Sequence, residues 1–396
     1  MKNFIFISPN FPENYWKFCK QLQYNGFNVL CIGDCPYEQL KDEVWGSLKE
    51  YYWVRSLENY DEVYRAVAFF IFKYGKIDFL ESNNEYWLER DAMLRTAFNI
   101  KSGFLQKDIK KIKFKSQMKK YYAKAGVKTA RYCLVKTLAG CKKFIDEVGY
   151  PVIVKPDNGV GANDTRKITN ENQLERFFEE KQPVQYIMEE FIYGEVNSYD
   201  AIIDGAGNPV FETGNVTPCS LMDVVNENGD SLFYIVNQLS EDVRKAGRDT
   251  VKAFGVKNRF VHFEFFRLTR NQPIGKKGEV VALEVNMRPS GGISPDMMNY
   301  ANSIDVYKIW ADIMSCGHTE LVCGEKYFCA FAGRRDEKAY YYSEQEILGK
   351  YAENMRIVDK VPYALSGAMG NRMFVAVFKT KEALDGFYSE IFKTIS

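Results

Sequence analysis

Short apolar runs alternate with amphipathic stretches over the first hundred residues. Residues 3–8, 27–33 and 77–80 are apolar enough to form buried strands. Between them, residues 13–24 and 60–73 have apolar positions at the spacing that is typical of helices. This alternation of strands and helices predicts a small, doubly wound parallel sheet.

The loops at the ends of these strands bear on function. Ser8-Pro9-Asn10-Phe11-Pro12 follows the first strand and has no glycine to admit a pyrophosphate, so we expect no dinucleotide site there. Glu81-Ser82-Asn83-Asn84 lies at the carboxyl end of a later strand, where ligands tend to bind. We expect its asparagines to cap the helix that begins near Asn84.

An apolar strand at 150–156 ends in Lys155 and leads through a glycine-bearing segment to a second strand at 165–168. The two strands would form a flap, because the phosphate-loop pattern Gly-x-x-x-x-Gly-Lys-Ser/Thr is absent. A buried lysine needs a partner such as phosphate. Gly159 and Gly161 would let backbone N–H groups close over that phosphate, although a plain hairpin turn is the alternative.

Residues 185–196 predict a strand, a short irregular break and the start of a further strand. Backbone groups that are unpaired at such a break can read the edge of a flat base. Glu195, just past Gly194, could accept hydrogen bonds from ribose hydroxyls. An ordinary edge turn would give the same pattern.

The most informative stretch runs from Val281 to Gly292. It reads as a strand in which Glu284, Asn286 and Arg288 share one face. An upstream strand-like run carries Glu264, and a turn-rich connector joins the two runs. An antiparallel hairpin would place Glu264 opposite Glu284, with side chains about 5 Å apart.

Two carboxylates at that distance repel each other unless a cation lies between them. Carboxylate and amide oxygens beside a guanidinium suit a divalent cation and the phosphates that it bridges. For any one glutamate the alternative is a solvated side chain on a plain hairpin. The four residues together favour a metal site.

Composition limits the class of protein. The 396 residues imply two or three domains, and 53 Lys and Arg against 52 Asp and Glu give a net charge of +1. This balance argues against a general nucleic-acid or membrane-surface binder. Nine cysteines without a CxxC pair indicate reduced thiols, and two histidines argue against a zinc site or a Ser-His-Asp triad.

Membrane and export signals are weak in the sequence. No segment approaches the ~20 apolar residues that cross a bilayer. The apolar run at the amino terminus is too short for a signal peptide. We therefore expect a soluble, cytoplasmic protein.

Two basic stretches remain. Residues 107–120 hold seven lysines, which we interpret as a solvated helix face; a nucleic-acid patch is the alternative, without a second basic stretch to support it. Arg334-Arg335 would form a surface ion pair or meet an acidic substrate.

Taken in order, these features resemble the ATP-grasp superfamily, which includes D-alanine–D-alanine ligase, biotin carboxylase and carbamoyl-phosphate synthetase. The resemblance covers roughly residues 1–315, and Glu-x-Asn-x-Arg-Pro-x-Gly-Gly is its most specific part. It is carried by a lysine before a helix, a strand-end lysine with a glycine loop, an acidic hinge and a carboxylate pair: Lys115, Lys155, Gly159, Gly161, Glu189, Glu190, Phe191, Ile192, Glu195, Glu264, Glu284, Asn286 and Arg288.

The resemblance implies an α/β and α+β protein, with an ATP-grasp fold behind an N-terminal doubly wound parallel-sheet domain. We expect the N-terminal domain at 1–105 and the ATP-grasp domain at 106–315. The latter would divide into a small lid subdomain at about 128–190 and a catalytic subdomain at about 191–315. Residues 316–396 would form an α+β extension that packs on or completes the ATP-grasp domain.

The resemblance also implies how ATP is held. Lys115 and Lys155 would hold the α- and β-phosphates, and the loop from Gly159 to Ala162 would cover them. A hydroxyl residue often ends this loop in the family, whereas this chain has Ala162-Asn163, so the loop contacts are expected to differ. The backbone of Glu190 and Ile192 would read adenine, within a hinge that also contains Glu189 and Phe191, and Glu195 would bind the ribose.

The remaining implied roles concern the metal and the reacting groups. Glu264, Glu284 and Asn286 would hold one or two Mg²⁺ ions, with Mn²⁺ as a substitute. Arg288 would reach the transferred phosphoryl group or the substrate carboxylate.

Together these roles describe an ATP- and Mg²⁺-dependent carboxylate–amine ligase that forms an acyl phosphate and releases ADP and phosphate. Attack of a carboxylate on the γ-phosphate brings like charges together, so positioning and charge neutralisation would supply most of the catalysis. The alternatives are a thiol acceptor, a simple phosphotransferase and a nucleotide-binding regulatory protein without turnover. The expected partners are a small carboxylate and a small amine, and the superfamily suggests a homodimer.

Overall fold

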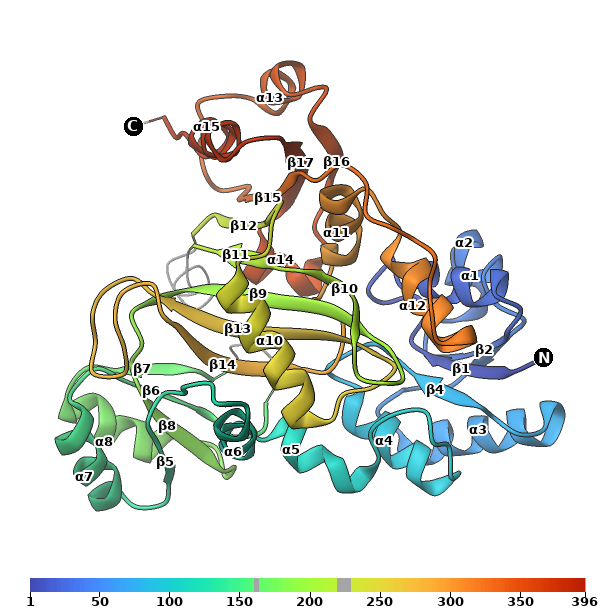
Figure 1. The fold of residues 1–396 in the computed structure, drawn as a ribbon, viewed down its shortest axis with the longest axis horizontal. Helices are drawn as coiled ribbons and strands as arrows, with labels where there is room; N and C mark the ends of the chain where they lie inside the picture. The colour runs from blue at the N-terminus through green and yellow to red at the C-terminus, as the bar shows by residue number, and fades with distance from the viewer. Residues whose placement is uncertain (160–163, 219–228, 396) are drawn as a thin grey trace.

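The computed structural model describes residues 1–159, 164–218 and 229–395, whose strands form three β-sheets (Figure 1). Gly161 and Ala162 of the expected phosphate-covering loop lie outside the described residues. No helix in the described ranges combines the length and the apolar character needed to cross a bilayer.

The first sheet is parallel and belongs to the amino-terminal part of the chain. Its strands are β1 (Asn3–Ile7), β2 (Asn28–Gly33), β3 (Glu50–Trp53) and β4 (Phe79–Glu81), and its helices are α1 (Trp16–Tyr24), α2 (Asp42–Trp45), α3 (Tyr60–Tyr74) and α4 (Leu88–Ala97). The strand order is β3-β2-β1-β4, with every pair parallel. The predicted parallel sheet is confirmed. Strand β3 is absent from the prediction because four residues give too short a periodic signal.

The second sheet is antiparallel and contains the two strands of the predicted flap. It contains β5 (Tyr132–Val135), β6 (Val152–Pro156), β7 (Arg166–Ile168) and β8 (Tyr186–Glu190) in the order β5-β8-β6-β7. Strands β6 and β7 pair as the expected hairpin. Helices α7 (Leu138–Val148) and α8 (Glu171–Glu180) contribute Phe144 and Phe177 to the core that covers this sheet. Ile153 and Lys155 of β6 lie on the opposite face of the sheet.

The third sheet has nine strands and runs through the centre of the molecule (Figure 1). Its main path is β14 (Val280–Asn286), β13 (Arg259–Leu268), β9 (Gly194–Ile203), β11 (Asn215–Thr217), β12 (Ser231–Ile235), β15 (Phe328–Arg334), β17 (Arg372–Phe378) and β16 (Met355–Lys360), and β10 (Pro209–Thr213) pairs with β9. Three of these strands come from the carboxy-terminal eighty residues, which therefore share one sheet with the β13–β14 hairpin.

Helices cover this sheet and connect it to the others. They are α5 (Ile109–Lys113), α6 (Lys115–Ala125), α10 (Glu241–Phe254), α11 (Ser294–Asn302), α12 (Val306–Cys316), α13 (Glu344–Lys350), α14 (Tyr363–Met369) and α15 (Lys381–Ile391). Helices α6 and α10 pack on the same core as Phe263 and Phe265 of β13. This core leaves the opposite face of β13 for polar side chains.

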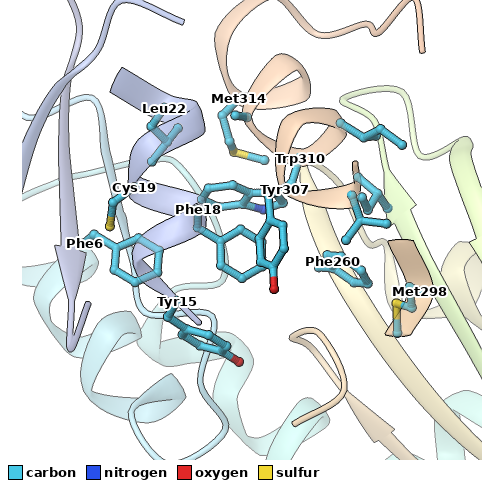
Figure 2. Packing of buried hydrophobic residues seen from close by; sticks show 14 of the residues in the cluster. Phe6, Tyr15, Phe18, Cys19, Leu22, Phe260, Met298, Tyr307, Trp310 and Met314 are labelled. Atoms are coloured by element: carbon cyan, nitrogen blue, oxygen red, sulfur yellow. The ribbon is translucent and has the colours of Figure 1, made fainter. Parts of the chain in front are cut away.

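An aromatic cluster joins the amino-terminal sheet to the central one (Figure 2). Phe18 of α1 contacts Tyr307 and Trp310 of α12, with ring centroids 4.7 and 5.1 Å apart. Phe18 and Trp310 are almost completely buried, and burying each such side chain stabilises the fold by roughly 1.5–3 kcal/mol. This packing holds the loops of the parallel sheet beside the end of β14.

Two expectations about polar residues are wrong. Helix α4 begins after Trp87 without a side-chain cap, and Asn84 Oδ1 instead accepts from the N–H of Tyr86. Arg334 and Arg335 are buried, and their guanidinium groups donate to backbone carbonyls. The sequence does not distinguish such a buried arginine from a surface arginine, because the carbonyls that it binds are far away along the chain.

Candidate active site

A cavity of about 370 Å³ lies between the antiparallel flap sheet and the β13–β14 hairpin. Its walls are apolar at Ile153, Ile192, Phe266 and Leu283 and polar at one end, where Lys119, Lys155 and Glu189 lie. Apolar walls with a few converging polar groups are typical of small-ligand sites, which usually measure roughly 300–1,000 Å³.

A buried carboxylate holds two lysines at the polar end of this cavity. Lys155 Nζ lies 2.7 Å from Glu189 Oε2, and Lys119 Nζ lies 2.5 Å from Glu189 Oε1. Burial by itself would raise the pKa of Glu189, but the charges of Lys119 and Lys155 outweigh burial and lower that pKa to about 2. Glu189 is therefore ionised throughout the neutral pH range.

The two lysines differ in their surroundings. The pKa of Lys119 is lowered, mainly by burial and also by the charge of Lys155, against the opposing charge of Glu189. Burial also opposes the charge of Lys155, but Glu189, Glu284 and Glu264 together raise its pKa. Lys155 thus faces the acidic pair of the hairpin as well as Glu189.

Helix α6 supplies two of the site lysines. Lys115, its first residue, lies 3.5 Å from Glu284 Oε1 and donates to the carbonyl of Gly159 at 3.3 Å. Lys119 follows one turn later on the same face of the helix. The expectation of a solvated lysine face is therefore wrong for Lys113, Lys115 and Lys119, which are all buried. Lys119 lines the cavity but was not among the site residues predicted from the sequence. Its spacing of four residues from Lys115 was the signal that could have identified it.

The predicted opposition of the two glutamates is confirmed. Glu264 of β13 pairs directly with Glu284 of β14, and a bulge follows Glu264. Burial and the neighbouring Glu264 raise the pKa of Glu284, and Lys115 opposes this rise. Burial would raise the pKa of Glu264 too, but His262 and Arg288 lower it below its usual value.

His262 is a second residue that sequence reasoning missed. Its Nδ1 lies 2.7 Å from Asp200 Oδ1, and its Nε2 lies 3.2 Å from Glu264 Oε1. Burial disfavours the charged imidazolium, but Asp200 and Glu264 raise the pKa of His262 to about 9. His262 and Glu264 are two apart on one strand, so their shared face could have been found from the sequence, whereas Asp200 could not.

The segment after β14 meets a loop of the amino-terminal parallel sheet. Arg288 Nε lies 3.7 Å from Glu85 Oε2, and Glu85 Oε1 lies 2.9 Å from Lys113 Nζ. Arg288 also donates to the carbonyl of Pro289. Glu85, in the loop after β4, has no signal in the sequence that connects it with Arg288.

The donor set of the hairpin fits Mg²⁺. No three His, Cys, Asp or Glu side chains gather as a metal site within the described ranges. The donors that the hairpin could offer are the carboxylates of Glu264 and Glu284 and the amide of Asn286. Mg²⁺ is commonly held by one or two carboxylates and takes its other ligands from phosphates and water. Burial is the main cause of the raised pKa of Glu284, and the charge of Glu264 adds to it. A cation between the two carboxylates would relieve the repulsion between them.

The hinge residues after Glu189 also border the cavity. Phe191 and Ile192 line it. The Glu190 carboxylate accepts from the Arg131 guanidinium at 2.6 and 2.9 Å, and the Glu190 N–H donates to the Arg131 carbonyl. Glu195 is exposed at the start of β9. The predicted adenine and ribose contacts of this hinge remain predictions.

Part of the chain is similar in sequence to known proteins. The family model of the ATP-grasp domain matches residues 115–292. The large chain of carbamoyl phosphate synthase from Thermotoga neapolitana is 27% identical over 229 residues, which is 55% of this chain and 20% of that protein. The chain thus spans about a fifth of the length of this curated relative.

Two solved structures share the fold at 15% sequence identity. The L-amino acid ligase from Bacillus licheniformis superposes with a TM-score of 0.73, over 99% of this chain and 97% of the ligase. The biotin carboxylase domain of 2-oxoglutarate carboxylase from Hydrogenobacter thermophilus, a dimer in complex with MgADP and bicarbonate, gives a TM-score of 0.71 over 99% and 90%. The domain model and the sequence relative thus show that residues 115–292 are an ATP-grasp domain, and the two structures show that the chain as a whole shares their fold.

Proposed function

We propose that the protein is an ATP- and Mg²⁺-dependent ligase that activates a carboxylate as an acyl phosphate for capture by an amine. The observation that carries this proposal is the position of Lys115, whose Nζ lies between the Gly159 carbonyl of the flap and Glu284 of the hairpin. One side chain thus joins the expected phosphate-covering loop to the expected metal ligands. Of the two structural relatives, one is an L-amino acid ligase and the other is a complex with MgADP, and both support this proposal.

The nucleotide would enter the cavity with its base between the apolar walls. Its phosphates would then meet Lys115 and Lys155, with Lys119 beside them. Glu189 keeps Lys119 and Lys155 together before ATP binds, because it is ionised and buried between them. A preorganised pair of cations loses little conformational entropy on binding a phosphate.

Glu264, Glu284 and Asn286 would hold Mg²⁺, which when bound neutralises negative charge on the phosphates. His262 holds the Glu264 carboxylate in place, and Asp200 holds His262. Arg288, at the end of the same strand, would neutralise the charge that develops as the substrate carboxylate approaches the γ-phosphate.

The reaction needs no nucleophile from the protein. A carboxylate oxygen would bond to the γ-phosphorus as the bond to the bridging oxygen breaks, which releases ADP. The amine nitrogen would then bond to the acyl carbon while the acyl–oxygen bond breaks, so that phosphate leaves with the electron pair and the amine loses a proton to it or to water. The protein contributes positioning and charge neutralisation, which dominate phosphoryl transfer generally.

A screen of amino acids and small carboxylates tests this proposal. We expect ADP formation that depends on one class of carboxylate, and a hydroxamate when hydroxylamine is present to trap the acyl phosphate. A stable phosphorylated product without hydroxamate would point to a phosphotransferase, and a thioester product to a thiol acceptor. ATP binding without carboxylate-stimulated turnover would point to a regulatory protein. The dimer of the Hydrogenobacter domain supports testing for a homodimer by light scattering.

A further inference from the structure

Helix α6 carries two lysines of the candidate site, and the residue before it does not cap it. That residue is Phe114, whose side chain accepts no hydrogen bond. The first N–H groups of a helix have no partner within the helix, so they need acceptors from elsewhere. The first two N–H groups of α6 find these acceptors in Asp157, which directly follows strand β6 of the flap sheet.

Asp157 binds both the start of α6 and the flap sheet. Its carbonyl accepts from the Lys115 N–H at 2.9 Å. Its carboxylate accepts from the Ser116 N–H and from the Ser116 hydroxyl, each at 2.7 Å. On the flap side, the Asp157 N–H donates to the Gln185 carbonyl at 2.8 Å. Asp157 and Ser116 are both almost completely buried, and we call their contact the Asp157–Ser116 clasp.

The clasp lies between the groups that would hold phosphate. Lys155, which lines the cavity, is two residues before Asp157, and Gly159 is two residues after it. The Gly159 carbonyl accepts from Lys115 Nζ at 3.3 Å. Burial raises the pKa of Glu284, and the charges of Lys115 and Lys155 both oppose this rise, so the two ammonium groups lie near one carboxylate. The clasp therefore joins two chain segments whose lysines meet at one place.

The clasp is more rigid than the other contacts between α6 and the flap sheet. The ion pair between Lys119 and Glu189 joins the same two parts, but through two long side chains. The clasp instead includes a bond between two backbone groups and a short aspartate side chain whose two oxygens are both bound. A buried carboxylate is costly unless it is hydrogen-bonded, and the dipole of α6 favours negative charge at this end of the helix. The clasp should therefore fix the position of α6 relative to the flap.

We propose that Asp157 is a positioning residue of the nucleotide site, which holds α6 and the end of β6 so that Lys115 and Lys155 reach the same phosphates. The proposal rests on the ligase function proposed above. Asp157 would act without touching the nucleotide, because its carboxylate is already bound by Ser116. Neither Asp157 nor Ser116 is among the described residues that line the cavity, where the base would bind. The clasp should thus affect the affinity for phosphate and not the affinity for the base.

The test compares two ligands in the presence of Mg²⁺: a non-hydrolysable ATP analogue, followed by calorimetry, and adenosine at millimolar concentration, followed by ligand-observed NMR. We expect Asp157→Asn to weaken binding of the ATP analogue about tenfold, because one acceptor oxygen of the clasp becomes an N–H donor. Adenosine has no phosphate and should bind this variant as it binds wild type. Asp146→Asn, which changes an exposed aspartate of α7 in the flap, is the matched control and should bind both ligands as wild type.

A second variant covers the case in which Asp157→Asn does not fold, which the thermal unfolding midpoint would show. Ser116→Ala removes only the hydroxyl that binds Asp157 Oδ2, and it should also weaken the ATP analogue while leaving adenosine unchanged. If both variants fold, their losses should not be additive in the double variant, since the two residues form one contact.

Three results would overturn the proposal: unchanged binding of the ATP analogue in the folded variants, an equal loss for adenosine, or additive losses in the double variant. An equal loss for both ligands would mean that the clasp only stabilises the fold around the cavity. The wild-type protein separates this proposal from the ligase function. Wild type that binds no ATP analogue would overturn both, whereas equal binding by wild type and variants would overturn the role of Asp157 alone.

Discussion

Glu264 of β13 lies directly opposite Glu284 of β14, and Lys115 Nζ of α6 lies 3.5 Å from Glu284 Oε1. The two carboxylates respond differently to their surroundings: His262 lowers the pKa of Glu264 against the effect of burial, whereas burial and Glu264 raise the pKa of Glu284. A carboxylate pair that is partly buried and unequal in pKa is expected at sites that bind cations or move charge.

Removal of a proposed metal ligand should abolish turnover without unfolding the protein. Glu284→Gln or Asn286→Ala is expected to lower carboxylate-dependent ADP formation by about a hundredfold or more, because charge stabilisation at the phosphates would be lost. Circular dichroism and the thermal midpoint should stay close to wild type. Glu320→Gln, on a side chain that is 93% exposed, is the control. Wild-type turnover in either site variant would refute the metal assignment.

Lys119 should contribute to ATP affinity although sequence reasoning overlooked it. Lys119→Met removes one cation from the polar end of the cavity and is expected to weaken ATP binding about tenfold, the usual loss for one charged hydrogen bond. Calorimetric titration with ATP measures this. Lys120→Met changes the next residue of α6, which is exposed, and should leave affinity unchanged. Equal affinities for the two variants would place Lys119 outside the nucleotide site.

Glu189 should make stability depend on acid pH. Its pKa in the folded protein is about 2 against an ordinary 4.5, so between these values the unfolded chain binds more protons than the folded one. The stabilisation is therefore fully present above about pH 4.5 and is lost as the pH falls toward 2. Urea unfolding of wild type and Glu189→Gln should show a large difference at pH 6 that narrows toward pH 3.5. A difference that is constant with pH would show that Glu189 is not paired as described.

The aromatic cluster should contribute much of the packing between the amino-terminal parallel sheet and the central sheet. Trp310→Ala removes a side chain that is 1% exposed and in contact with Phe18, and is expected to lower the free energy of unfolding by about 3–5 kcal/mol. Phe72→Ala, on a side chain that is 90% exposed, should change it by less than about 0.5 kcal/mol. Urea unfolding checks both. Similar losses for the two variants would mean that the cluster does not stabilise the packing between the parallel sheet and the central sheet.

Local patterns were enough to predict much of the fold and the centre of the site. Alternation along 281–288 and 261–268, with a roughly symmetrical turn between the two runs, places Glu264 opposite Glu284. The same reasoning predicts the parallel sheet and the β6–β7 flap. The family resemblance rests on the order of such local features and is confirmed by the comparisons.

Contacts between distant residues were beyond the sequence. Glu189 meets Lys119, Asp200 meets His262, and Glu85 meets Arg288 across long stretches of chain. Nothing in the spacing of these residues records that they meet, because each pair comes from elements that lie far apart in the chain. Asp200 and His262 lie on neighbouring strands of one sheet, and the other two pairs join separate parts of the fold. The periodicity of the backbone determined which side chains share a face, since that depends on neighbours along the chain. Only the tertiary structure decided which charges neutralise one another, since that depends on how buried faces fill space.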